Sequence, residues 1–487
     1  MTAIRSLQSI PLPHLLLMFM LGALAGLIYM SLSPIWWLMS LGMAIIIAVF
    51  ISNRTGIGII LLALFILQWL FGVFRAIPKE ITWLPDVIIM ILTAKFFYLQ
   101  ADRHRLITSP IDKVIAAILL LGLLSAIYNN VSPITVLFGY RKFFKYTLLF
   151  YILRHIESDD KFYRFFFYII FILLLAQIPV TIAQAIVYGT IGKDVADNVS
   201  GTLGWKATGA MALLMNFAIS MMIGFYTQTH RLRFVAVALL FTVPIILGSG
   251  QYGLIMLPLT AITCWLLGHE INLKNLVKVP LLVSVIIMLV IPAINYHDYR
   301  YHGNLLKFLS SPSEIYSLNI QTRKEGTFGR FQVIDVAHRV LSENPAQLLI
   351  GFGPGNASES YFHDYSGKLE KEFRGMKIWG IQYTAIILEY GFLGLLLFLW
   401  LFFKLWRLNR HLYHRTSDPF WKSITVGYNG MILAYLLGCL YNPAWYYDIL
   451  AFCFWLTTAG LATRLAVETK LSEAKVSALG LLQQHHN

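Results

Sequence analysis

Apolar stretches of about twenty residues recur along almost the whole chain, and they constrain its fold more than any other feature. A helix of that length crosses the roughly 30 Å hydrocarbon layer of a bilayer. Of the 487 residues, 58% are hydrophobic and only 13% are charged, whereas soluble domains carry about 25% charged residues. The sequence therefore predicts an all-α, polytopic helical membrane protein with about fourteen transmembrane helices, twelve being the alternative count.

The apolar stretches divide the chain into four parts. We expect a transmembrane bundle of about eleven spans over residues 1–295, a large loop with short helices over 296–380, about three spans over 381–465, and a tail over 466–487. With the N-terminus inside, the inner loops hold about twenty Lys and Arg residues and the short outer loops about three. The positive-inside rule therefore predicts that both termini are cytoplasmic and that the large loop lies outside.

Several classes of site lack their sequence signals. The three cysteines stand singly in apolar segments, which argues against a disulfide framework or a metal cluster. There is no Walker motif, no His-Glu-x-x-His and no Cys/His metal spacing. The net charge of +14 has two competing explanations, cytoplasmic anchoring charges and an anionic substrate. We expect no metal, no cofactor, no nucleotide and no nucleic-acid partner.

A basic cluster lies at the outer start of the predicted span 134–153. In "FGYRKFFKY", Arg141, Lys142 and Lys145 run against the inside-positive pattern. They either extend to outer headgroups or form an anion site at the outer surface. Lys206, in "GTLGWKATGA", enters another span from the same side, and the N-terminal ends of both helices favour an anion there.

Other ionisable residues lie within predicted spans. Asp86 and Lys95 interrupt the span 81–99. Glu389, in "IILEYGFLGLLLF", lies about two turns into the span 381–403. A charge at such depth needs a partner or a function. Glu389 is either a structural partner for one of the outer cations or a proton acceptor, and the sequence leaves both interpretations open.

The centre of the large loop, "RFQVIDVAHRVLSENPAQLLIGFGPG", is typical of an amphipathic helix. Its expected apolar face comprises Val333, Ile334, Val336, Ala337, Val340 and Leu341. Asn344-Pro345 is expected to end the helix. The glycines that follow, in "GFGPG", resemble a phosphate cradle, but they lie outside the cytoplasm and Pro354 lacks an N–H donor. A tight structural turn is the better interpretation.

The same loop carries further candidates for chemistry. Arg330 and Arg339 are separated by two and a half turns of the predicted helix, which directs them to different faces. Asp335 and His338 lie between them, and His363 follows the glycines. Carboxylates and histidines of this kind can act as general bases.

The order of these features resembles the O-antigen ligase and O-antigen polymerase family of bacterial inner-membrane proteins. In that family many spans precede one long periplasmic loop, and a few spans follow it. The resemblance is clearest over residues 326–400, in "FGRFQVIDVAHRVLSENPAQLLIGFGPG" and then "LEYGFLGLLLF". It is weaker at "FGYRKFFKYTLLFY" and "GWKATGAMALLMNFA".

The resemblance implies a glycan carried on undecaprenyl diphosphate, transferred at the periplasmic face without nucleotide or metal. Arg330 matches the loop arginine of the family, and Arg141 matches the upstream basic position. Such arginines would stabilise the departing diphosphate. The family's ligases carry a histidine before the span that follows the loop, where this chain reads "GIQYTAI". That departure favours a polymerase over a ligase, with a chain-length regulator as a candidate partner.

The expected site therefore combines the family positions with the ionisable residues above. The candidate catalytic residues are Arg330, Glu389, Asp335 and His363. The candidate substrate-binding residues are Arg141, Lys142, Lys206 and Arg339. Two other functions stay open: a flippase or transporter, and a non-catalytic assembly subunit that binds a partner through the loop. Transporters commonly show two related halves, and this chain shows no such repeat.

Overall fold

The computed structural model describes residues 34–72, 74, 79–100, 108–156, 159–190, 198–204, 207–248, 251–268, 291–292, 295, 330–360, 365–373 and 376–484. Every regular element in these ranges is a helix, which confirms the all-α prediction. The predicted span 12–31 and most of the span 279–295 lie outside them.

Six helices within the described ranges are long and apolar enough to cross a membrane. They are α4 (Asn53–Gly72), α5 (Leu84–Gln100), α8 (Asp160–Thr190), α9 (Thr208–Thr229), α19 (Gln382–Arg415) and α21 (Asp448–Gln484). Their length and composition make this a membrane-embedded protein. The count of about fourteen spans stays a prediction.

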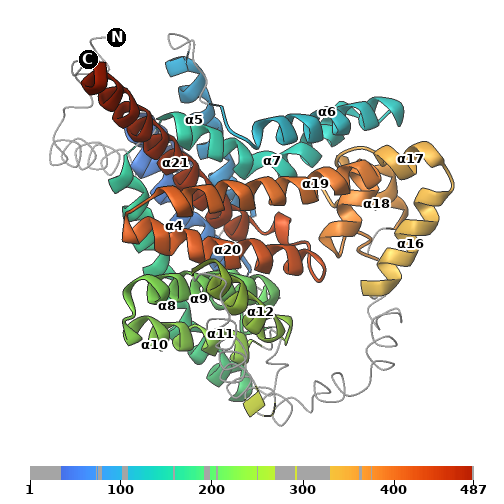
Figure 1. Ribbon diagram of the computed structural model, residues 1–487. Coiled ribbons are helices and arrows are strands. Elements are labelled where there is room, and N and C mark those ends of the chain that lie inside the picture. Colours follow the sequence, from blue (N-terminus) through green and yellow to red (C-terminus); the bar gives the residue numbers. More distant parts are fainter. Residues whose placement is uncertain are drawn as a thin grey trace.

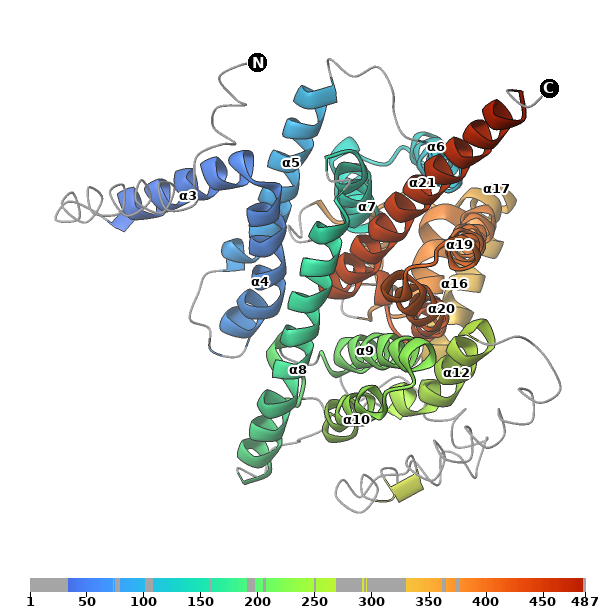
Figure 2. The ribbon, with the colours of Figure 1, turned by 60° about the vertical axis from the view of Figure 1, so that its left-hand side comes forward.

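The other helices complete the bundle and the large loop. Six further spans, predicted at 34–52, 113–128, 134–153, 234–248, 251–268 and 423–440, coincide with described helices. These are α3 (Pro34–Ile51), α6 (Asp112–Tyr128), α7 (Pro133–Ile156), α10 (Leu232–Leu240) and α11 (Thr242–Leu247) in one predicted span, α12 (Gln251–Gly268) and α20 (Pro419–Cys439). In the loop lie α16 (Arg330–Ser342), α17 (Pro345–Ile350) and α18 (Lys368–Glu372). α3 contacts α4 and α5 and projects away from the other helices (Figure 2).

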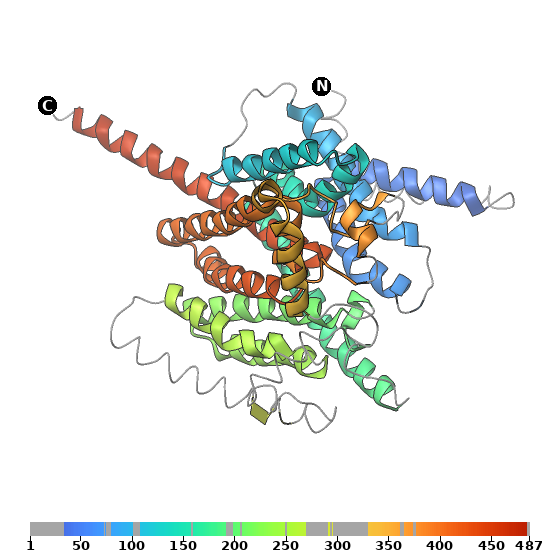
Figure 3. The same cartoon turned by 90° about the vertical axis from the view of Figure 1, so that its right-hand side faces the viewer.

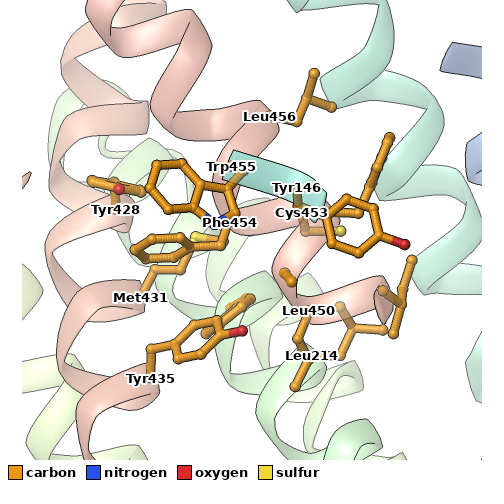
Figure 4. Packing of buried hydrophobic residues seen from close by; sticks show 14 of the residues in the cluster. Tyr146, Leu214, Tyr428, Met431, Tyr435, Leu450, Cys453, Phe454, Trp455 and Leu456 are labelled. Atoms are coloured by element: carbon orange, nitrogen blue, oxygen red, sulfur yellow. The ribbon is translucent and has the colours of Figure 1, made fainter. Parts of the chain in front are cut away.

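Helices from the two ends of the chain pack against each other (Figure 1). α9 lies along α20, α7 along α21, and α6 along α19. Aromatic side chains fill the junction: Phe143 of α7 contacts Trp445, whose indole N–H donates to the Phe143 carbonyl at 2.8 Å, and both rings contact Phe398. Figure 4 shows the neighbouring core around Tyr435, Phe454 and Trp455. These contacts hold the two halves of the chain in one bundle.

The predicted tail is helical over most of its length. α21 runs without a break through the expected boundary at residues 465 and 466 as far as Gln484 (Figure 3). Arg464 and Glu468 pair at 2.7 Å one turn apart, and Glu468 also accepts a hydrogen bond from Thr416 at 2.9 Å. Such a pair stabilises a helix locally, which explains the extension beyond the apolar segment.

α16, α17 and α18 form a small unit beside α6 and α19 (Figure 1). Val333, Val336, Ala337 and Leu341 of α16 are buried, and the last three share a cluster with Leu369 and Leu388. The prediction for Ile334 was wrong, because its side chain is exposed at the edge of this face. Asn344 accepts a hydrogen bond from the Ala346 N–H, and Pro345 opens α17, so the predicted helix end is confirmed.

Candidate functional site

A break in α19 organises the site. Gly391 interrupts the helix with φ 69° and ψ −172°, a conformation open in practice only to glycine. The carbonyls of Leu388 and Glu389 accept hydrogen bonds from Phe352 and Gly353 of the loop, at 2.7 and 3.0 Å. The loop backbone therefore replaces part of the helical hydrogen bonding that the break removes.

The glycine-rich segment, residues 351–355, fits this break closely. Gly351, Gly353 and Gly355 all have positive φ, which confirms the predicted tight turn. A Cβ at Gly391 would lie 2.2 Å from the Leu349 oxygen, and a Cβ at Gly351 would lie 2.5 Å from the Glu389 carbonyl carbon. The glycines therefore have two roles: they allow the tight turn, and they allow the loop backbone to approach α19 closely.

Helices α6 and α7 hold the other side of this segment. Ser125 of α6 and Asn129, which directly follows this helix, both donate to the Gly351 carbonyl at 2.9 Å. A Cβ at Gly139 of α7 would lie 2.2 Å from the Gly355 nitrogen. The consecutive helices α6 and α7 and the distant helix α19 therefore enclose the glycine-rich segment.

Glu389 lies beneath this segment, immediately before the break. Its side chain is only 1% exposed. One carboxylate oxygen accepts a hydrogen bond from the Ser358 N–H at 2.9 Å, and Gly355 also lies close to the carboxylate. A buried carboxylate of this kind ties the loop to α19, because an unpaired charge would be costly in such surroundings.

Lys142 is the cation whose charge acts on this carboxylate. The charges of Glu389 and Glu359 act on its ammonium group, which donates to the Glu359 carbonyl. The ammonium also lies 5.8 Å from the Trp379 ring centroid and 5.5 Å from that of Tyr446. Burial raises the pKa of the Tyr446 phenol well above its usual range, and the Glu389 charge adds to the effect, so the phenol stays protonated.

The other two residues of the basic cluster in "FGYRKFFKY" have acidic partners. Arg141 pairs with Asp86 of α5 at 2.8 Å, and its guanidinium lies 4.4 Å from the Trp83 ring. Lys145 pairs with the same Asp86 at 3.3 Å and with Asp448 at 2.9 Å. The two interpretations of the basic cluster drawn from the sequence, contact with outer headgroups and a free anion site, did not include these ion pairs. The position of Asp86 in the sequence could have predicted this pairing, since Asp86 lies at the outer end of its predicted span.

A polar cleft of about 650 Å³ lies beside the glycine-rich segment. The turn between α6 and α7, the loop and the small helices α16 to α18 enclose it. Its polar and charged side chains are those of Asn129, Asn130, Ser132, Thr135, Glu343, Gln347, Asn356, Tyr365, Ser366, Lys368, Lys371 and Glu372. Amides, hydroxyls and an exposed tyrosine ring suit a ligand rich in hydroxyl groups.

The cleft is held open by contacts among its own walls. Gln347 donates to the Asn129 side chain at 2.9 Å, and Thr135 donates to the Tyr365 carbonyl at 3.0 Å. The Tyr365 ring stacks with Phe138, their centroids 6.1 Å apart. No sequence pattern marked these residues, because amides near a Pro and a Gly are typical of an ordinary turn.

The candidates predicted in α16 lie elsewhere. Asp335 and Arg339 pair at 2.7 Å on its outer face, with side chains 65% and 67% exposed. Arg330 begins the helix, but its side chain is outside the described residues, as are Lys206 and His363. The charges of Glu389 and Lys142 therefore act on each other, whereas Asp335 and Arg339 pair with one another on the exposed face of α16.

The described residues contain no group of three His, Cys, Asp or Glu side chains that could hold a metal ion. Cys264, Cys439 and Cys453 are buried as free thiols. Comparison with models of known protein families and with curated proteins found no match.

Proposed function

We propose that this chain is a polymerase that joins lipid-diphosphate-linked oligosaccharide repeat units of a bacterial surface polysaccharide. It would act at the periplasmic face of the inner membrane, by glycosyl transfer without a metal. The observation that supports this most is the polar cleft of about 650 Å³ next to the glycine-rich segment, with the Glu389 carboxylate buried beneath that segment and exposed to the charge of Lys142. A polar cleft on an apolar bundle suits a substrate with a sugar head and a lipid tail.

The proposed reaction forms one bond and breaks one. A hydroxyl oxygen of the acceptor sugar attacks the anomeric carbon of the donor sugar, and the bond from that carbon to the diphosphate oxygen breaks. The hydroxyl proton passes to a base, and the lipid diphosphate leaves with one more negative charge. Cations at the donor diphosphate stabilise this charge as it develops.

The geometry ranks the candidates for these roles. Glu389 is favoured as the base over Asp335, because Glu389 is buried while Asp335 is exposed and neutralised by Arg339. Lys142 is favoured as a binding cation over Arg141, whose charge Asp86 already compensates. The proposed role of Arg330, to bind the diphosphate, is supported by its position in the motif alone.

The test is a reaction of the purified full chain with a lipid-diphosphate-linked oligosaccharide. Wild-type protein should yield longer glycans and release one lipid diphosphate for each bond formed. Arg330→Ala should slow elongation by about 10²–10³-fold, while the matched variant Arg339→Ala should stay close to wild type. Transport of the lipid-linked glycan without bond formation would instead identify a flippase, and transfer only to a different acceptor would identify a ligase.

A further inference from the structure

A second cavity lies in the bundle, apart from the polar cleft. It is an apolar groove of about 240 Å³ among α8, α9, α10, α20 and α21. Leu174, Phe217 and Met222 are among the side chains that line it. Figure 4 shows Leu214, Met431 and Cys453, which line the same groove, close together in the core.

The groove is an indentation into the bundle and not a flat lipid-facing surface. Leu214 and Phe217, which line it, are almost completely buried. Its methionines, Met221, Met222 and Met431, have flexible side chains that adapt to irregular apolar ligands. These properties suit a hydrocarbon chain.

The groove also has the length of one membrane leaflet. Along α9 its lining runs from Phe225, one turn before the helix ends, back to Leu214. At about 1.5 Å per residue this is roughly 16 Å, close to half of the roughly 30 Å hydrocarbon layer. A single acyl chain that enters at the α9–α10 end therefore fits one leaflet.

A cationic side chain lies at the α9–α10 end of the groove. Arg233, at the start of α10, lines the groove, and its guanidinium lies 5.0 Å from the Phe234 ring. Arg164 also lies at this end, 4.3 Å from the Phe420 ring, but it pairs with Asp160 and Asp418. Among the described residues no carboxylate pairs with Arg233, so its charge is available to an anion.

We propose that the groove binds one acyl chain of an anionic glycerophospholipid, whose phosphate pairs with Arg233. The apolar lining accounts for the chain, and the cation at the open end accounts for the headgroup. An anionic lipid is favoured over a zwitterionic one because it brings no ammonium group next to Arg233.

The test is native mass spectrometry of the full chain in detergent with added dipalmitoyl phosphatidylglycerol. Wild-type protein should retain one lipid at the lowest concentrations. Arg233→Gln should weaken this binding about fivefold. Arg231→Gln is the matched control, because Arg231 is exposed two residues away and does not line the groove; it should bind as wild type does.

Two further ligands separate a lipid groove from a simple anion site. Dihexanoyl phosphatidylglycerol should bind more weakly than the dipalmitoyl form, and inorganic phosphate should fail to displace the long-chain lipid. Equal binding by Arg233→Gln and Arg231→Gln would overturn the proposal, as would displacement by phosphate. Both ligand comparisons use unmodified protein, so a folding defect in a variant cannot produce the result.

Discussion

Two carboxylates near the large loop, those of Glu389 and Asp335, lie in opposite surroundings. Glu389 is 1% exposed, accepts from a backbone N–H and lies under the glycine-rich segment. Asp335 is 65% exposed and pairs with Arg339 on the outer face of α16. Both carboxylates belong to the same stretch of candidate residues, yet only one is enclosed by the fold.

This difference teaches that environment, more than residue type, decides what a carboxylate contributes. An exposed ion pair is worth about 0–1 kcal/mol, because water solvates its charges nearly as well. A buried carboxylate must be held by donors and opposite charge, and its removal leaves those groups unsatisfied. The buried region should therefore respond strongly to substitution, and the exposed region weakly.

The largest effect should come from Gly391→Ala. The new Cβ would lie 2.2 Å from the Leu349 oxygen, in a conformation that only glycine adopts readily. We expect a loss of about 3 kcal/mol or more and elongation at background, measured by thermal unfolding in detergent and by glycan length. Gly58→Ala in α4 is the control: its Cβ would meet no atom within 4 Å, so it should leave both properties intact.

Glu389→Gln should separate the structural role of this side chain from a chemical one. The amide oxygen can still accept from the Ser358 N–H, so the loss of stability should be smaller than for Asp86→Asn, whose carboxylate pairs directly with two cations. Loss of the base should lower the elongation rate by about 10²–10⁴-fold. An active Glu389→Gln protein would show that Glu389 only holds the loop in place.

Asp86→Asn tests the network beside the site. It removes the charge that Arg141 and Lys145 share, and it should cost about 3 kcal/mol of stability. Asp159→Asn breaks an exposed pair with Arg54 and should cost less than about 1 kcal/mol. Equal shifts of the unfolding midpoint in the two variants would contradict the distinction between buried and exposed charges.

The smallest effects are expected at the outer face of α16. Asp335→Asn and Arg339→Gln should each change stability by less than about 0.5 kcal/mol and leave elongation near the wild-type rate. A loss of activity in either variant, measured with the same lipid-linked oligosaccharide, would show that the outer face of α16 belongs to the site. It would contradict the distinction between the buried Glu389 and the exposed Asp335–Arg339 pair.

The positions of the helices could largely be predicted from residues close together in the sequence. Apolar runs gave the limits of most described spans to within a few residues, and Asn344 and Pro345 marked the end of α16 as predicted. These features depend on residues close together in the sequence. The large loop over residues 296–380 stays a prediction.

The site depended on contacts between distant residues. The run "LEYGFLGLLLF" is typical of a continuous helix, and only the docked loop explains why it breaks at Gly391. Likewise, Arg141 meets Asp86, 55 residues away, and Asn129 meets Gln347, 218 residues away. Local periodicity contains no information on such pairs.

The most direct test of the account asks whether the glycan occupies the polar cleft. Lys368→Cys places a thiol in the cleft, and Arg339→Cys places one on the outer face of α16, while the three native cysteines are buried. We predict that a lipid-diphosphate-linked oligosaccharide slows maleimide labelling at position 368 and leaves position 339 unaffected. Unchanged labelling at 368 with bound substrate, or protection at 339 alone, would contradict the account.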